Sequence, residues 1–223
     1  MIAQKIQRIK RELPEGVRLV AVSKYHPETS IAEAYKAGQR IFGESHVQEM
    51  QRKHEVLPKD IEWHFIGHLQ TNKVKYLASY VALIHAVDSR HLLEEISKQG
   101  AKHNRRIPCL LQLHVAQEET KYGFSIPEAE NFLASGEWRN LEGIELRGVM
   151  CMASLTDDEE QIAHEFDMAH QFFLHTRDTY FTDSARHDFS ECSWGMSDDY
   201  HIALQHGSTL VRIGSRIFGQ RQY

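Results

Sequence analysis

The chain has few cysteines, and none of them is paired in a spacing typical of metal or redox sites. Cys109, Cys151 and Cys192 lie far apart, are odd in number and form no C-x-x-C motif. This pattern argues against a disulfide-stabilised scaffold and against a cysteine zinc site. A reducing, cytoplasmic setting is therefore expected.

Long apolar runs and segments rich in glycine, proline or serine are also missing. No apolar run approaches the length of a membrane-spanning helix, and residues 1–16 are too charged for a signal peptide. Without a linker-like segment, residues 1–223 are expected to form one domain. The formal net charge of −5 gives no support for a nucleic-acid partner.

What the sequence does contain is a regular alternation of strand-length apolar runs with helical patterns. After an amphipathic helix at residues 2–12, strands are expected at residues 17–23, 40–43, 62–67, 82–87, 107–115, 144–152, 185–192 and 208–214. Helices are expected between them at residues 28–38, 46–56, 70–79, 89–102, 127–136, 157–181 and 197–206. Eight such units predict a single (β/α)8 TIM barrel with an extra N-terminal helix.

An open doubly wound sheet is the alternative fold. Such a sheet more often carries GxGxxG after its first strand, where this chain has Ser23-Lys24-Tyr25. In a barrel, the chemistry lies at the C-terminal ends of the strands. Lys24 ends the first expected strand, and partial burial there would favour the neutral, nucleophilic amine that forms Schiff bases. A strand-end lysine that simply reaches into solvent is the competing interpretation.

Two turns of small residues near the C-terminus favour the functional interpretation. Gly195-Met196-Ser197 and Gly214-Ser215 each open into a helix on consecutive β/α units. Such turns offer backbone N–H groups and hydroxyls to an anion, and the loops after strands 7 and 8 of a barrel commonly bind phosphate. Asp198 and Asp199 are expected to face away from that anion. A lysine and a phosphate site on one barrel mouth suggest a phosphorylated aldehyde, with pyridoxal 5′-phosphate (PLP) as the obvious cofactor.

Seven motifs occur in order across nearly the whole chain and match these strand ends. They read AVSKYHP, FGESHVQE, WHFIGHLQTNK, EETKYGF, GVMCM, GMSDD and STLVRIGSRIFG. Together they resemble the PLP homeostasis proteins, a family of single-domain PLP-binding barrels similar to the N-terminal domain of alanine racemases. Ser45 and His46 stand where the family motif has Asn and Tyr, and Ser215 replaces a threonine but keeps the hydroxyl.

The resemblance implies a role for each matched residue. Lys24 would hold PLP as an internal aldimine, and Arg212 would face the pyridine nitrogen. The phosphate would be bound by Ser197, Gly214 and Ser215. The rest of the pocket would be lined by Met150, Ser193, His64 and the loop after the second strand.

Other residues carry weaker signals. The fifteen histidines include no HExxH motif, and His164, His170 and His175 are not spaced to share a helix face, so no metal site is expected. His64 is expected to be either a satisfied core histidine or a cofactor contact. Lys121 is either a second amine near the pocket or a mobile-loop lysine.

Three functions fit these residues: a PLP carrier or regulator, a PLP-dependent amino-acid racemase, and a Schiff-base aldolase. The aldolase needs a proton shuttle, for which Glu44 is the nearby candidate. A racemase needs two bases on opposite faces of the cofactor, and Lys24 supplies one. In the racemases that the chain resembles, the other base is a tyrosine placed by subunit pairing. With Tyr223 as the last residue, the second racemase domain that supports this pairing is not expected, so the base would have to be a tyrosine such as Tyr25 or Tyr122. We therefore expect a monomeric carrier without robust turnover, with PLP-dependent apoenzymes as possible recipients.

Overall fold

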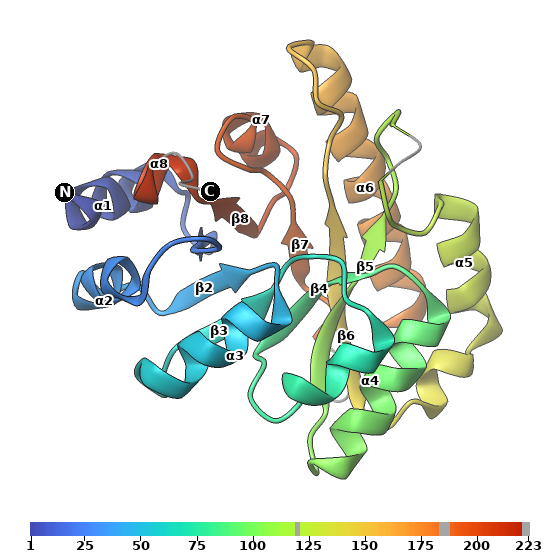
Figure 1. Ribbon diagram of the computed structural model, residues 1–223. Coiled ribbons are helices and arrows are strands. Elements are labelled where there is room, and N and C mark those ends of the chain that lie inside the picture. Colours follow the sequence, from blue (N-terminus) through green and yellow to red (C-terminus); the bar gives the residue numbers. More distant parts are fainter. Residues whose placement is uncertain (119–120, 183–187, 220–223) are drawn as a thin grey trace.

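The computed structural model describes residues 1–118, 121–182 and 188–219. Parallel strands close into a barrel in chain order, and β1 pairs with both β2 and β8 (Figure 1). The strands are β1 (Arg18–Val22), β2 (Ile41–Glu44), β3 (Glu62–Phe65), β4 (Leu83–Val87), β5 (Ile107–Leu113), β6 (Ile144–Cys151), β7 (Glu191–Ser193) and β8 (Leu210–Ile213). The predicted (β/α)8 barrel is confirmed.

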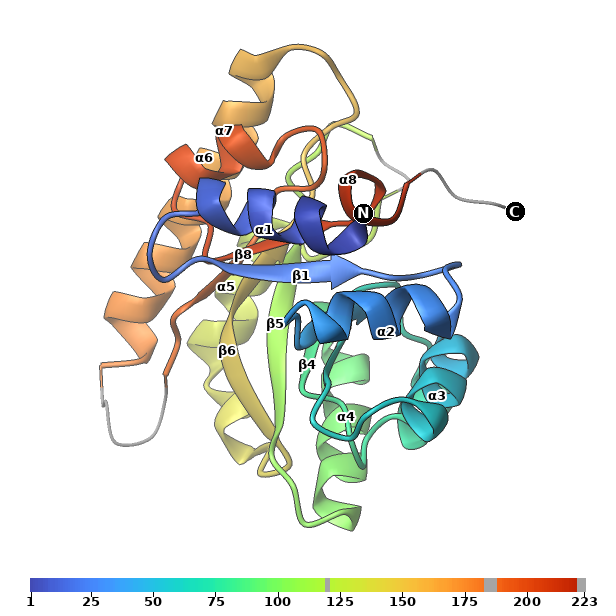
Figure 2. The ribbon, with the colours of Figure 1, turned by 90° about the vertical axis from the view of Figure 1, so that its left-hand side faces the viewer.

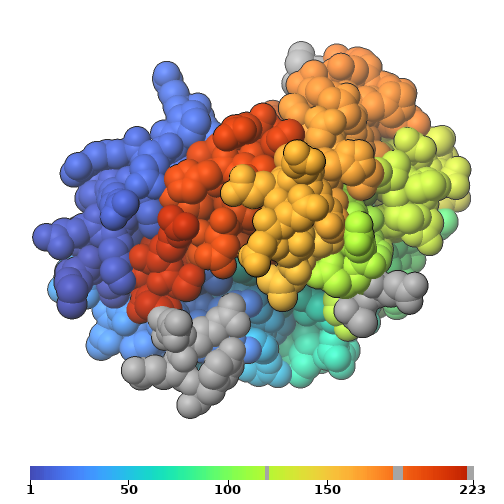
Figure 3. Space-filling model, turned by 90° about the horizontal axis from the view of Figure 1, so that it is seen from above, coloured from blue at the N-terminus to red at the C-terminus, as the bar shows by residue number. Residues whose placement is uncertain are grey.

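Helices surround the barrel on its outer side. They are α1 (Ile2–Glu12), α2 (Glu28–Lys36), α3 (Val47–Val56), α4 (Arg90–Lys102), α5 (Ile126–Ser135), α6 (Glu159–Tyr180), α7 (Tyr200–Gln205) and α8 (Ser215–Phe218), with 3-10 helices η1 (Thr71–Tyr76) and η2 (Glu137–Asn140). The extra helix α1 packs against α2 and α8, so the first and the last of the described helices lie side by side (Figure 2). In the space-filling view the first and last segments, blue and red, adjoin on one face (Figure 3).

Several helices begin at polar residues that satisfy their first N–H groups. Ser125 accepts a hydrogen bond from Glu128 N at the start of α5, and the Glu128 carboxylate bonds back to Ser125 N. Asp158 accepts from two backbone N–H groups at the start of α6. These caps fix where the helices start relative to the strand ends that precede them.

The seventh strand differs from its prediction over residues 185–192. Residues 185–187 of that range lie outside the described residues, and residues 188–190 form no regular strand before β7. Phe189 is buried in this irregular segment, with its ring centroid 4.3 Å from that of Phe181. An apolar side chain in a loop therefore produced a strand-like pattern. The helix predicted at residues 70–79 is the shorter 3-10 helix η1.

The inside of the barrel is filled by side chains, as in other barrels of this type. One apolar layer consists of Val20, Leu83, Ala86, Leu110, Met150 and Leu210. A much larger apolar core lies between the strands and the helices. A ligand site must therefore lie at one end of the barrel. Among the described residues, no helix is both long and apolar enough to cross a membrane.

Candidate functional site

A pocket of about 290 Å³ opens at the C-terminal ends of the strands. Its size is close to the lower end of small-ligand pockets, which span about 300–1,000 Å³. It is lined by Val22, Lys24, His26, Ser45, Ile66, Met152, Met196, Ser197, Asp198, Arg212, Gly214, Ser215 and Gly219. Five residues expected at the site from the sequence are thus among the residues that line one pocket: Lys24, Ser197, Arg212, Gly214 and Ser215.

Lys24 reaches this pocket from the turn that follows β1. The strand ends at Val22, and Lys24 is half-buried two residues later. Ser23 N donates to Gly43 O at 3.0 Å, which extends the pairing of β1 with β2 up to the turn. Tyr25 then takes a left-handed backbone conformation with φ 66°. The amine is therefore presented at the barrel mouth by a short, sharply bent segment.

The expected phosphate side of the pocket is formed by the turns after β7 and β8. Gly214 N lies 3.4 Å from Ser197 Oγ, so the two turns touch. A Cβ added at Gly214 would lie 3.1 Å from Val22 O and 3.2 Å from Val22 Cβ, which is tighter than normal contact. The absence of a side chain at Gly214 thus lets this turn pack closely against the end of β1, and Gly214 itself lines the pocket.

The two aspartates of the GMSDD segment behave differently from each other. Asp198, expected from its charge to face away from an anion, is exposed and is among the residues that line the pocket. Asp199 turns back onto its own loop, where its Oδ1 accepts a hydrogen bond from Met196 N at 2.5 Å. Lining the pocket does not by itself point the Asp198 carboxylate at an anion, so the expectation that it faces away stays a prediction.

Arg212 is a buried cation at the floor of the pocket, with 4% of its surface exposed. Its Nη1 donates to Ser193 O at 2.7 Å and to Ser193 Oγ at 2.6 Å, and its Nη2 donates to Cys151 O at 3.0 Å. Burial lowers the pKa of the guanidinium, while nearby Cys151 and Asp199 raise it. These three bonds to described residues fix its plane and use three of its five N–H groups.

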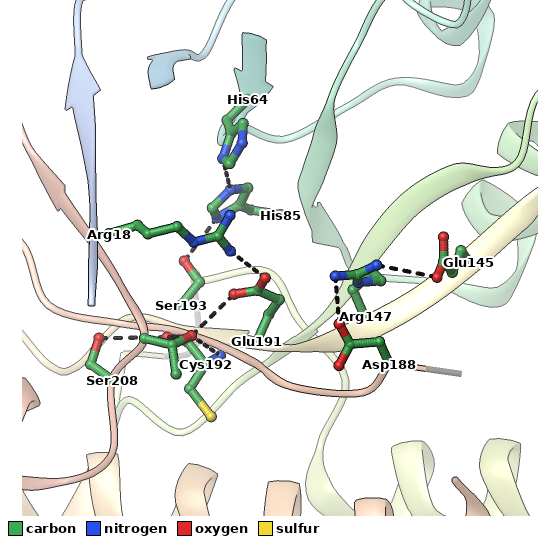
Figure 4. Close-up of polar contacts among 11 residues, drawn as sticks. Arg18, His64, His85, Glu145, Arg147, Asp188, Glu191, Cys192, Ser193 and Ser208 are labelled. Atoms are coloured by element: carbon green, nitrogen blue, oxygen red, sulfur yellow. Dashed lines mark hydrogen bonds and ion pairs between the residues drawn. The ribbon is translucent and has the colours of Figure 1, made fainter. Parts of the chain in front are cut away.

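His64 and Ser193 belong to a polar chain inside the barrel, below the pocket. His64 Nδ1 lies 2.9 Å from His85 Nε2, and His85 Nδ1 lies 2.8 Å from Ser193 Oγ (Figure 4). Since Ser193 also accepts from Arg212, the chain leads up to the floor of the pocket. Burial lowers the pKa of both histidines, that of His64 to about 3. His64 is thus a satisfied core histidine, and His85, which sequence reasoning missed, is its partner.

Met150 also lies deeper than the sequence suggested. It is 1% exposed in the interior apolar layer, and Met152 lines the pocket instead. Met152 lies just beyond Cys151, the last residue of β6, and is therefore nearer than Met150 to the C-terminal end of the barrel. The structure does not place Met150, Ser193 or His64 among the residues that line the pocket.

The loop expected at the pocket after the second strand does line it, through Ser45, whereas Ile66 and His26 were not expected there although they also follow strand ends. Ser45 follows β2, Ile66 follows β3 and His26 lies beyond the Lys24 turn. Lys121 lies elsewhere: its Nζ donates to Ala153 O at 2.7 Å and pairs with Glu118 at 3.1 Å. In the part of the chain that the structure describes, no group of three or more His, Cys, Asp or Glu could hold a metal ion.

Comparison with known proteins defines the class of this barrel. The family model for the alanine racemase N-terminal domain matches residues 1–222. The alanine racemase of Bartonella henselae superposes with a TM-score of 0.73 at 16% identity, over 99% of this chain and 58% of the racemase, and shows the fold alone.

Nearer relatives define the family. The pyridoxal phosphate homeostasis protein of Aquifex aeolicus is 35% identical, over 100% of this chain and 96% of that protein. The structure of PipY from Synechococcus elongatus with PLP bound is similar at a TM-score of 0.87 and 32% identity, over 98% of this chain and 100% of PipY. The chain belongs to the pyridoxal phosphate homeostasis protein family, as the sequence motifs indicated.

Proposed function

We propose that this protein binds PLP in the pocket at the barrel mouth and holds it covalently through Lys24. The observation that carries the proposal is that an amine, two turns with hydroxyl and N–H donors, and a buried guanidinium line the same pocket. They come from the ends of β1, β7 and β8. The naming of relatives as PLP homeostasis proteins and the PLP bound to PipY support the same ligand.

The residues present fit this cofactor by their chemistry. PLP supplies an aldehyde, which condenses with a primary amine and releases water. The turns at Ser197 and Ser215 offer hydroxyls, and Gly214 lines the pocket between them without a side chain that would compete with a phosphate group. Arg212 can only donate, so its role would be a hydrogen bond to the unprotonated ring nitrogen.

We further propose that the protein is a carrier that exchanges PLP and has no useful racemase turnover. Racemisation needs a second base across the cofactor from Lys24. The two tyrosines that could serve are occupied at the rim and do not line the pocket. Tyr122 stacks on His68 at 3.9 Å between ring centroids, and Tyr25 Oη lies 3.4 Å from His46 Nε2. This arrangement favours the carrier.

The aldolase hypothesis is not supported, because Glu44, its candidate proton shuttle, is not at the pocket. Glu44 has 0% of its side chain exposed and does not line the pocket. Its Oε1 accepts hydrogen bonds from Lys53 Nζ and Ser23 Oγ at 2.8 and 2.6 Å. A carboxylate held in this way does not reach a substrate at the barrel mouth.

The proposed recipients of released PLP are PLP-dependent apoenzymes, and the proposed state is a monomer. One chain supplies the lysine, both turns and the arginine of the pocket, so the site needs no residue from a second copy.

The test is an absorbance spectrum of the protein mixed with PLP, followed by borohydride reduction and peptide mapping. We expect a band shifted from that of free PLP and a reduced adduct on Lys24. An adduct mapped mainly to Lys121 or Lys73 would refute the assignment of Lys24. Equal binding of pyridoxal and PLP would refute the phosphate site.

A further inference from the structure

A buried ion cluster lies directly beside the turn that carries Lys24. It consists of Glu44 at the end of β2 and of Glu49 and Lys53 on α3, and is called the β2–α3 cluster below. Lys53 Nζ lies 2.8 Å from Glu44 Oε1 and 2.7 Å from Glu49 Oε1. The Lys53 and Glu44 side chains are 0% exposed, and that of Glu49 is 15% exposed.

The β2–α3 cluster binds both chain neighbours of Lys24. Lys53 Nζ donates to Ser23 O at 2.8 Å, and Ser23 Oγ donates to a Glu44 oxygen at 2.6 Å. On the other side of Lys24, Tyr25 N donates to Glu49 Oε1 at 2.7 Å. Three atoms of the turn are thus held by one cluster, while Lys24 between them lines the pocket.

The shape of this turn needs such support. Tyr25 has a φ of 66°, a left-handed conformation that is disfavoured for any residue with a Cβ. Strained backbone of this kind persists where its surroundings over-determine it. Glu49 provides the acceptor for the N–H group of that residue, so it stabilises the bend that follows Lys24.

A contribution to the stability of the fold does not by itself explain why these charged residues are buried here. The cost of removing such charges from water offsets most of their attraction, and apolar residues of similar size often serve the fold as well. Glu44 Oε2 has no hydrogen-bond partner among the described residues, so the cluster is not optimised even for its own polar atoms. Lys53 makes three bonds to oxygen with its three N–H groups, which leaves it no role as a nucleophile.

We infer that the β2–α3 cluster is a positioning device, which sets the direction in which Lys24 presents its amine to an aldehyde ligand. The inference rests on the proposed function and deepens it by naming the residues that prepare the amine. The condensation itself joins the Lys24 nitrogen to the aldehyde carbon, releases one water and needs no other reactant. The cluster residues take no part in that exchange of atoms.

The test uses Glu49→Ala, which removes the acceptor of Tyr25 N at a partly exposed position. Glu49→Gln keeps an acceptor oxygen for Tyr25 N and should therefore restore the behaviour of the wild type. Arg52→Ala is the matched control, since Arg52 is on the same helix and pairs only with Glu28 at 3.0 Å among the described residues. Two ligands are compared: PLP, and pyridoxine 5′-phosphate, which has the same ring and phosphate but no aldehyde.

Glu49→Ala should slow formation of the reducible Lys24 adduct by about ten- to a hundred-fold, the scale of a misplaced reacting group. Glu49→Gln should restore most of the rate, and Arg52→Ala should match the wild type. The affinity for pyridoxine 5′-phosphate should be the same in all of them. If Glu49→Ala does not fold, Ser23→Ala, which removes the hydroxyl bonded to Glu44, gives the same comparison.

Two outcomes overturn the inference and leave the proposed function standing. A wild-type rate in Glu49→Ala means that the cluster does not position the amine. Equal loss of both ligands without rescue by glutamine means that the cluster only supports the fold. A wild-type protein that binds pyridoxine 5′-phosphate but forms no Lys24 adduct overturns the proposed covalent function, and this inference with it, so the two failures are distinguished.

Discussion

His64 Nδ1 and His85 Nε2 lie 2.9 Å apart in the interior of the barrel, and one nitrogen must donate while the other accepts. Both side chains are buried, and burial lowers the pKa of each. Arg212 and Arg18 add positive charge near His85 and lower its pKa further. The folded barrel therefore keeps this pair uncharged, although free histidine is largely protonated in mild acid.

This pair makes the stability of the protein sensitive to acid. Below the ordinary pKa near 6.5 the unfolded chain binds protons at both histidines, whereas His64 in the folded chain binds one only near pH 3. A histidine whose pKa is lowered by folding contributes its full stability at pH values above the pKa of the unfolded chain. That stability is lost as the pH falls below this pKa. The free energy of unfolding should thus drop by about 1.4 kcal/mol per pH unit for each histidine in this window.

Urea denaturation at a series of pH values below neutrality measures this slope. His64→Gln should remove about half of the contribution of the pair. His91→Gln is the control, because His91 is exposed on α4 and should leave the slope unchanged. If the free energy of unfolding falls with pH equally steeply in the wild type, His64→Gln and His91→Gln, the pair takes up protons in the folded state.

Replacement of Lys24 should abolish the covalent adduct and leave the fold intact. Lys24→Ala is expected to lose the shifted absorbance band and the borohydride-trapped product, because no other lysine lines the pocket among the described residues. Its unfolding free energy should change little, since a half-buried rim lysine contributes little core packing. Mass spectrometry and urea denaturation check the two parts separately, and a trapped adduct of wild-type yield in Lys24→Ala would contradict the assignment.

Removal of either hydroxyl on the phosphate side should weaken PLP binding. A hydrogen bond to a charged group contributes about 1.5–3 kcal/mol, so Ser197→Ala or Ser215→Ala should raise the dissociation constant about ten- to a hundred-fold. Pyridoxal without the phosphate should bind far worse than PLP to the wild type and should respond little to these changes. Ser135→Ala, at an exposed position at the end of α5, is the control. Titration by fluorescence or absorbance gives the constants.

The carrier hypothesis predicts little proton exchange at Cα of amino acids. Alanine and serine incubated with the PLP-loaded protein in heavy water should not gain deuterium with inversion at rates typical of enzymes, about 1–10³ per second. The reason is the lack of a tyrosine across the pocket from Lys24 among the described residues. Nuclear magnetic resonance follows the exchange directly, and inversion at those rates would establish the racemase instead.

The sequence was informative wherever function follows a strand end. Lys24, Ser197 and Ser215 could be placed because apolar runs mark the strands, and the barrel brings their C-terminal ends together. Depth inside the barrel could not be predicted in the same way. Met150 lies in the interior apolar layer and Met152, just beyond the end of β6, lines the pocket, and the sequence does not show at which depth of the barrel the strand ends.

Contacts between distant strands also could not be predicted from the sequence. His85 sits in an ordinary apolar run, and its partner Ser193 is 108 residues further along the chain. The β2–α3 cluster was hidden for a related reason, because Lys53 resembles a solvated helix residue until its three acceptors are seen. An amphipathic pattern in the sequence does not show which of its polar residues become buried.

The pairing of β1 with β8 has a consequence for the order of assembly. Val20 lies opposite Arg212 in this pairing, so the pocket spans the seam where the first and last strands join. Lys24 precedes Ser197 and Ser215 in the chain and is therefore made before them in synthesis. A ligand that bridges them recognises only the closed barrel, and its binding energy is added to the stability of that closed state. Cofactor occupancy therefore reports that folding is complete.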